Sequence, residues 1–124
     1  MFSAAVAERF PSTSHGSTFA GETLACRVDL EFLDEMQSLL PRIRDTGDSL
    51  RAELSLFGDV RGKGMMLAMP LDRHGDAVVA AARERGLLIN CTQSTVLRFL
   101  PPYILTPMQA HEAATILGEA LSAC

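Results

Sequence analysis

Apolar residues with helical spacing run through the first half of the chain and constrain its fold more than any other feature. They recur three or four residues apart, or at the sum of the two, at Val28, Phe32, Met36, Leu40, Ile43, Leu50 and Leu54. This spacing predicts helix with one buried stripe. Because Pro41 has no backbone donor, we expect a break near Gln37, with Ser38 capping a second helix and Pro41 in its first turn.

The second half of the chain predicts short strands alternating with helices. The apolar run Met65–Met69 favours one strand within Val60–Pro70 that is covered on both faces, and a buried helical segment also fits the run. The other predicted elements are a short helix within 1–10, a helix over 77–85 closed by Gly86, strands over 87–91 and 96–100 joined as a hairpin, and a last helix over 106–121 capped by Thr106 before Pro107. The order predicts an α/β fold in which helices cover one face of a small, partly antiparallel sheet.

Composition narrows the classes of function. A chain of 124 residues with 48% hydrophobic and 21% charged residues is typical of a soluble globular domain. The net charge of −4 without a basic run argues against a nucleic-acid partner, and no apolar stretch has the length of a membrane span. Met1–Phe10 lacks the features of a secretory signal. The wide spacing of Cys26, Cys91 and Cys124 argues for reduced thiols in a cytoplasmic protein and against a metal site.

Two places carry polar groups that suit anion binding. Ser14–Gly21 clusters hydroxyl and imidazole groups beside glycines, which suits a phosphate or a carboxylate, although an ordinary turn has the same composition. Arg98 lies in an apolar strand, on one face with Val96 and Leu100, so its guanidinium needs an acidic partner, solvent or a ligand. His74 and His111 are expected at the solvated surface, and His15 has no clear role as a general base.

Four segments resemble class III aminotransferases of the acetylornithine branch, in order along nearly the whole chain. They are His15-Gly16-Ser17-Thr18-Phe19 with Gly21 and Leu24-Ala25-Cys26, Val60-Arg61-Gly62-Lys63-Gly64-Met65-Met66-Leu67, Arg83-Glu84-Arg85-Gly86-Leu87-Leu88-Ile89-Asn90, and Leu97-Arg98-Phe99-Leu100-Pro101-Pro102. The resemblance implies the C-terminal portion of a cytoplasmic, fold-type-I, pyridoxal-phosphate-dependent homodimer. Such an enzyme moves an amino group from N-acetylornithine to 2-oxoglutarate in arginine biosynthesis.

The resemblance also implies a division of the chain and roles for three residues. Residues 1–23 correspond to the end of the large domain, 24–57 to connecting helices and 58–124 to the C-terminal small domain. Thr18 is implied to bind the cofactor phosphate and Ser17 the substrate, both in the neighbouring subunit's active site. Arg98 is implied to meet the substrate carboxylate or a glutamate of the large domain.

The chain departs from the family pattern at Ala20, where a glycine is usual, and at Glu22-Thr23, where Asn-Pro is usual. The negative charge of Glu22 is unfavourable beside a phosphate unless its carboxylate points away.

Lysine is nearly absent: of the eleven Lys and Arg residues only Lys63 is a lysine. Its position between two glycines at a strand end indicates an exposed charge. The Schiff-base lysine implied by the resemblance precedes the matching segment, so we expect no catalytic residue in these 124 residues and no transamination by the chain alone. Two alternatives remain: a stand-alone binding or oligomerisation module, and an aminotransferase acting on another omega-amino acid.

Overall fold

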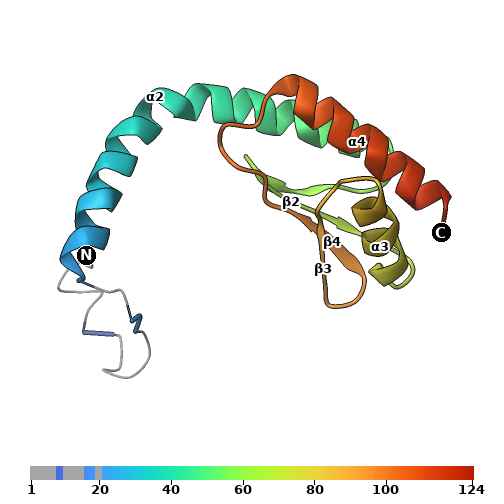
Figure 1. The fold of residues 1–124 in the computed structure, drawn as a ribbon, viewed down its shortest axis with the longest axis horizontal. Helices are drawn as coiled ribbons and strands as arrows, with labels where there is room; N and C mark the ends of the chain where they lie inside the picture. Colours follow the sequence, from blue (N-terminus) through green and yellow to red (C-terminus); the bar gives the residue numbers. More distant parts are fainter. Residues whose placement is uncertain (1–7, 10–15, 19–20) are drawn as a thin grey trace. The chain divides into compact units, whose positions relative to one another are not determined.

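The computed structural model describes residues 8–9, 16–18 and 21–124. The helix predicted within 1–10 therefore lies largely outside the described residues. The elements are α2 (Thr23–Leu54), β1 (Arg61–Lys63), β2 (Met66–Pro70), α3 (Asp76–Glu84), β3 (Asn90–Thr92), β4 (Val96–Phe99) and α4 (Pro107–Ser122) (Figure 1). The chain forms two compact units, residues 1–37 and 38–124, which we describe separately. None of the described helices is long and apolar enough to cross a membrane.

The predicted break near Gln37 is wrong, because α2 continues through Pro41. A proline inside a helix removes one hydrogen bond, here to the carbonyl of Gln37, at a cost of about 3 kcal/mol. Burial of Ile43, Leu50 and Leu54 on the following turns offsets that cost. The boundary between the two compact units nevertheless falls directly after Gln37.

The single strand predicted over 60–70 is a hairpin of two strands. Lys63 pairs with Met66 across a turn at Gly64 and Met65, and Gly64 has a φ of 57°. The strand was also predicted to be buried on both faces. Met66 is 65% exposed, however, whereas Leu67 is 1% exposed. The run therefore alternates between a buried and an open face.

The four strands form one antiparallel sheet in the order β1-β2-β4-β3, which confirms the predicted fold class and the hairpin between the last two strands. Strand β3 begins at Asn90 and not at Leu87. The reason lies in the end of α3, where Gly86 has a φ of 89° and the Leu87 amide donates to the Ala82 carbonyl at 2.9 Å. This cap ties residue 87 to the helix.

Helices cover one face of the sheet in the 38–124 unit. Leu67, Met69, Leu97 and Phe99 point into the core, where they meet Leu50 and Leu54 of α2 and the buried residues of α3 and α4. As predicted, Thr106 caps α4 and Pro107 is at its first position; the side chain of Gln109 completes a capping box that was not predicted from the sequence. Because one face of each strand is fixed by the core, the opposite face is presented outward.

Close contacts hold the β1–β2 hairpin against α2. A side chain at Gly47 would lie 2.6 Å from the carbonyl oxygen of Gly64, so glycine permits this approach. One turn further on, Arg51 donates a hydrogen bond to the carbonyl of Gly62. The sequence pattern gave no indication of either contact.

Candidate functional site

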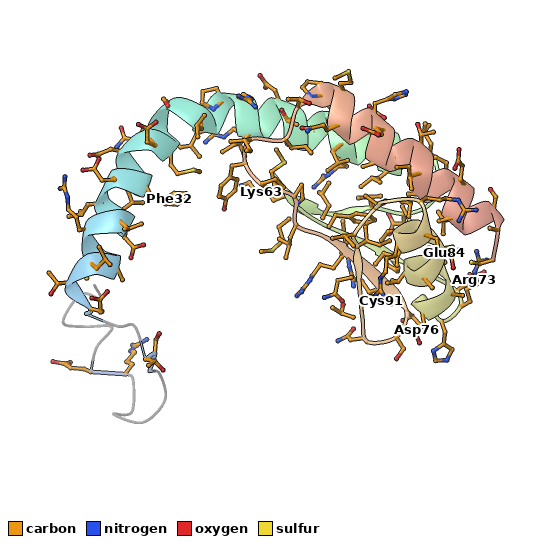
Figure 2. All side chains as sticks on the ribbon, viewed as in Figure 1. Phe32, Lys63, Arg73, Asp76, Glu84 and Cys91 are labelled. Atoms are coloured by element: carbon orange, nitrogen blue, oxygen red, sulfur yellow. The ribbon has the colours of Figure 1, made fainter. Side chains whose placement is uncertain are left out.

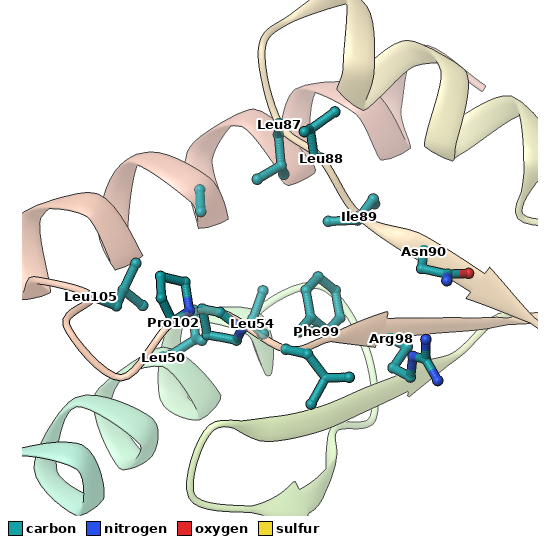
Figure 3. A pocket seen from close by; sticks show the side chains of 13 residues that line it. Leu50, Leu54, Leu87, Leu88, Ile89, Asn90, Arg98, Phe99, Pro102 and Leu105 are labelled. Carbon is teal, nitrogen blue, oxygen red and sulfur yellow. The ribbon is translucent and has the colours of Figure 1, made fainter. Parts of the chain in front are cut away.

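An apolar pocket of about 500 Å³ opens in the 38–124 unit, at the end of the sheet where β4 leaves it. Its walls come from the last turns of α2, the Leu87–Asn90 segment and the chain from Arg98 to Leu105. Arg98 and Asn90 pair across β4 and β3 and supply polar groups at one end of the pocket, away from Pro102 and Leu105 (Figure 3). A largely apolar cavity with a few polar groups at one side is typical of a small-molecule site.

Arg98 stands on the face that the sequence predicted. Leu97 and Phe99 are buried, whereas Arg98 between them is exposed. Within residues 8–9, 16–18 and 21–124 its guanidinium makes no hydrogen bond or ion pair, in contrast to the paired Arg27, Arg73 and Arg85. Its charge is therefore available to a carboxylate that reaches the polar end of the pocket.

Ser17 and Thr18 belong to the other compact unit, residues 1–37. Both are exposed, and the position of a side chain at Gly16 is open space. Exposed hydroxyls beside an unobstructed backbone can donate to anionic oxygen atoms. The neighbouring Phe19 and Ala20 lie outside the described residues, so the departure from the family pattern at Ala20 does too.

Glu22 has a structural task. Its carboxylate accepts hydrogen bonds from the backbone amides of Leu24 at 3.1 Å and Ala25 at 2.7 Å, so it caps the N-terminus of α2. The negative charge is directed at the helix end, where the helix dipole favours it. The repulsion that the sequence predicted for a nearby phosphate is reduced by this orientation, and the capped helix end is closed to other anions.

We expect Glu22→Ala to fray the first turn of α2, because two backbone amides lose their acceptor. The loss should be about 1 kcal/mol of local stability. Amide hydrogen exchange at Leu24 and Ala25 should accelerate about fivefold, with the rates in α4 unchanged as the internal control. Unchanged exchange at both amides would show that the cap contributes nothing.

Lys63 lies at the end of β1, where its side chain is exposed (Figure 2). Among the described residues it has no hydrogen-bond or ion-pair partner. This position matches the exposed charge that the sequence predicted. His111 on α4 is also at the surface, where its Nδ1 lies 2.9 Å from a carboxylate oxygen of Glu53.

Sequence reasoning missed two residues near Arg98. Asn90 is its direct partner on β3, and Arg61 is the partner of Ala68, which is the residue opposite Arg98 on β2. Both depend on strand register. Gly62 and Gly64 are typical turn residues and could have indicated the β1–β2 turn. The continuous apolar run after them favoured a single strand instead.

An antiparallel sheet with helices on one face is shared with solved fold-type-I aminotransferases. The structure matches acetylornithine aminotransferase from Elizabethkingia anophelis with a TM-score of 0.73 and 28% identity, over 96% of this chain and 35% of that one. It matches ornithine aminotransferase from Toxoplasma gondii, which was solved with PLP at partial occupancy in the active site, with a TM-score of 0.72 and 32% identity, over 97% and 31%. The fold is therefore that of a part of these enzymes.

Sequence comparison gives the family. The model of the aminotransferase class-III family matches residues 1–121, and the chain belongs to this family. It is 44% identical to acetylornithine aminotransferase of Aquifex aeolicus, over 94% of this chain and 31% of that protein. It is 41% identical to acetylornithine aminotransferase 1 of Bordetella bronchiseptica, over 87% and 30%. The chain thus spans about 31% of the length of the first of these relatives and 30% of the second.

Class-III aminotransferases depend on pyridoxal phosphate. The described residues can supply part of a binding site for its phosphate group. The exposed hydroxyl of Thr18 can donate to a phosphate oxygen, and Gly16 leaves the approach open. The helix end that follows cannot serve the phosphate as well, because Glu22 already occupies its amides. This chain therefore fits the cofactor as one of several contributors.

Proposed function

We propose that this chain forms the C-terminal part of an aminotransferase that moves an amino group from N-acetylornithine, or a close omega-amino acid, to 2-oxoglutarate. This amino transfer takes place in the cytoplasm and is a step of arginine biosynthesis. Residues 1–23 form the end of the large domain, residues 24–57 form helices that connect it to the small domain, and residues 58–124 form the small domain. The exposed Arg98 beside an apolar pocket carries the proposal, because this cation has no partner among the described residues and lies where a substrate carboxylate can reach it.

The residues of this chain bind and orient; they do not move protons. Arg98 holds a substrate carboxylate by a bidentate contact at the polar end of the apolar pocket. Thr18 donates to the cofactor phosphate and Ser17 to the substrate, in the active site of the neighbouring subunit of a homodimer. Pyridoxal phosphate, when bound, supplies the electron sink for amino transfer.

The chain alone is proposed to be inactive. A lysine must hold the cofactor and move a proton, and Lys63 stands exposed at a strand end, outside the pocket and on another strand from Arg98. The catalytic lysine is proposed to come from the part of the enzyme that the relatives have in addition to the matching region.

A chimera tests the proposal. This chain replaces the matching 118 residues of the Aquifex aeolicus enzyme, with which it shares 44% identity. We expect the chimera to transaminate N-acetylornithine, and Arg98→Gln to raise KM for the amino donor by about tenfold, the effect of losing a charge-assisted contact. Thr18→Ala should weaken pyridoxal phosphate binding.

Arg83→Gln is the matched control, because Arg83 is exposed on α3 and lines no part of the pocket. A chimera that folds and binds pyridoxal phosphate but shows no activity with N-acetylornithine would contradict the substrate. An unchanged KM in the Arg98 variant would remove Arg98 from the site.

A non-catalytic oligomerisation module is the second candidate. It is favoured by the apolar side chains exposed on the first turns of α2, with 69% exposure at Leu24, 57% at Val28 and 47% at Phe32. This candidate requires the isolated chain to self-associate through these residues. Analytical ultracentrifugation of the chain and of the Leu24→Ser, Val28→Ser double variant tests this candidate. The module is supported only if the unmodified chain self-associates and the double variant does not.

A further inference from the structure

One wall of the apolar pocket is a segment that forms neither helix nor strand. Residues 100–105 connect β4 to α4, and four of them line the pocket: Leu100, Pro101, Pro102 and Leu105 (Figure 3). Two of these residues are prolines, which have no backbone donor and cannot extend the ladder of β4. Within the segment the backbone forms one turn, in which the Leu105 amide donates to the Pro102 carbonyl at 3.0 Å.

Burial holds this wall only weakly. Leu105 packs partly against the core, but Leu100 is 52% exposed, Tyr103 44% and Ile104 68%. Apolar side chains that stay in water gain little from packing, and a segment with few buried contacts opens at low cost. The wall therefore needs a further contact to keep its position.

Arg42 supplies that contact. Its Nη2 donates a hydrogen bond to the carbonyl of Ile104 at 2.9 Å, across 62 positions of the sequence. Arg42 lies on α2, the helix that also carries Leu50 and Leu54 of the pocket lining. The hydrogen bond therefore ties together two segments that line the same pocket.

A fixed wall makes the pocket a better binding site. A ligand that enters a pocket with a mobile wall has to order that wall, and the cost of ordering lowers the affinity. The apparent affinity falls in proportion to the fraction of molecules in which the pocket is formed. The loss of one hydrogen bond is enough to change that fraction about fivefold.

We propose that Arg42 is a positioning residue for the apolar pocket. By holding the Ile104 carbonyl it fixes the 100–105 segment as a wall, and it thereby sets the affinity of the pocket for the apolar part of a ligand. Arg42 itself lines no part of the pocket, so it acts through the backbone of the segment. The inference rests on the proposed function only for the identity of that ligand, the amino donor.

Tyr103 provides a local probe of the tether. The chain has one tyrosine and no tryptophan, so its intrinsic fluorescence reports on the 100–105 segment. We expect Arg42→Gln to lower the fluorescence anisotropy of Tyr103, because the shorter side chain loses the carbonyl and the segment moves more freely. Arg42→Lys keeps a donor of similar reach and should retain the anisotropy.

Arg44→Gln is the matched control, because Arg44 is exposed on the same helix and lines no part of the pocket. It should leave the anisotropy of Tyr103 unchanged. Circular dichroism confirms that each variant keeps the fold. An anisotropy that is the same in Arg42→Gln as in the unmodified chain overturns the tether.

Ligand binding to the full chain tests the consequence for the pocket. The probe is hexanamide, an uncharged amide with an apolar tail, whose binding does not need the charge of Arg98. The backbone NMR signals of Asn90 and Leu105, which both line the pocket, report binding at this place. We expect Arg42→Gln to raise the Kd about fivefold. Arg42→Lys should restore most of the affinity, and Arg44→Gln should not change it.

Two results would overturn the positioning role: a Kd that Arg42→Gln leaves unchanged, or hexanamide that shifts neither signal in the unmodified chain. The same variant in the chimera separates this inference from the proposed function. If Arg42→Gln raises both the Kd for hexanamide and the KM for N-acetylornithine, with kcat unchanged, both stand. If only the Kd rises, the positioning role stands and the amino donor does not occupy this pocket.

Discussion

Replacing Gly62 with alanine should unfold the β1–β2 hairpin and cost about 3 kcal/mol or more of the free energy of unfolding. Gly62 has a φ of 133°, which side chains rarely adopt, and a Cβ there would lie 2.0 Å from the Met66 carbonyl oxygen and 2.9 Å from the Leu67 Cα. These neighbours are backbone atoms of the paired strand, so they cannot move aside without breaking the pairing. Urea denaturation measures the loss.

The Gly62 variant should also loosen the hairpin from α2. Arg51 donates to the carbonyl of Gly62, so loss of the turn also releases β1 from α2. Arg61 would then leave its row with Ala68 and Arg98, and trypsin should cut after Arg61 and Lys63 faster than in the unmodified chain.

Gly58→Ala is the matched control. Its φ is ordinary, and its nearest neighbours are the flexible Met69 side-chain atoms at 3.5 Å, an ordinary contact distance. The control should change stability by less than about 0.5 kcal/mol. If Gly62→Ala is equally mild, the hairpin geometry is wrong.

Leu97→Ala should cost about 2 to 5 kcal/mol, the range for removing a large aliphatic side chain from a core. Leu97 is 0% exposed and lies in the centre of β4, opposite Met69 on one side and Cys91 on the other. No solvent reaches the space that the truncation leaves, and the paired strands limit its collapse.

Arg98→Ala, one residue further along, provides the contrast. Arg98 is exposed and has no hydrogen-bond or ion-pair partner within the described residues, so its loss should change stability by less than about 0.5 kcal/mol. Both variants are measured by the same denaturant titration. A large loss of stability in the Arg98 variant would mean that this arginine serves the fold, which would weaken the substrate role proposed for it.

Local chemistry made several elements predictable. The Thr106 cap with Pro107, the left-handed Gly86 after α3 and the polar connection between β3 and β4 each act within a few residues. Their effects on the backbone do not depend on distant neighbours. The alternation around Arg98 was predictable for the same reason, because side chains in a strand point to opposite faces in turn.

Two other elements were decided at longer range. Pro41 disfavours a helix locally, and α2 continues through it with buried residues on the turns that follow. The run from Met65 to Met69 has no polar alternation, so its sequence does not indicate which residues face outward. Packing of the core against one side of β2 decides this. The pocket beside Arg98 joins α2 to segments more than thirty residues away, and no local pattern reports such a contact.

By itself the sequence determined the family, the order of most elements and the residues Ser17, Thr18 and Arg98 as candidates, because motifs and periodicity are written along the chain. Only the tertiary structure decided that Glu22 caps α2, that Arg98 is unpaired within the described residues and that Arg61 shares its row. Each of these depends on which backbone segments lie beside one another. Strand register and helix packing set that arrangement, and they are properties of the folded chain as a whole.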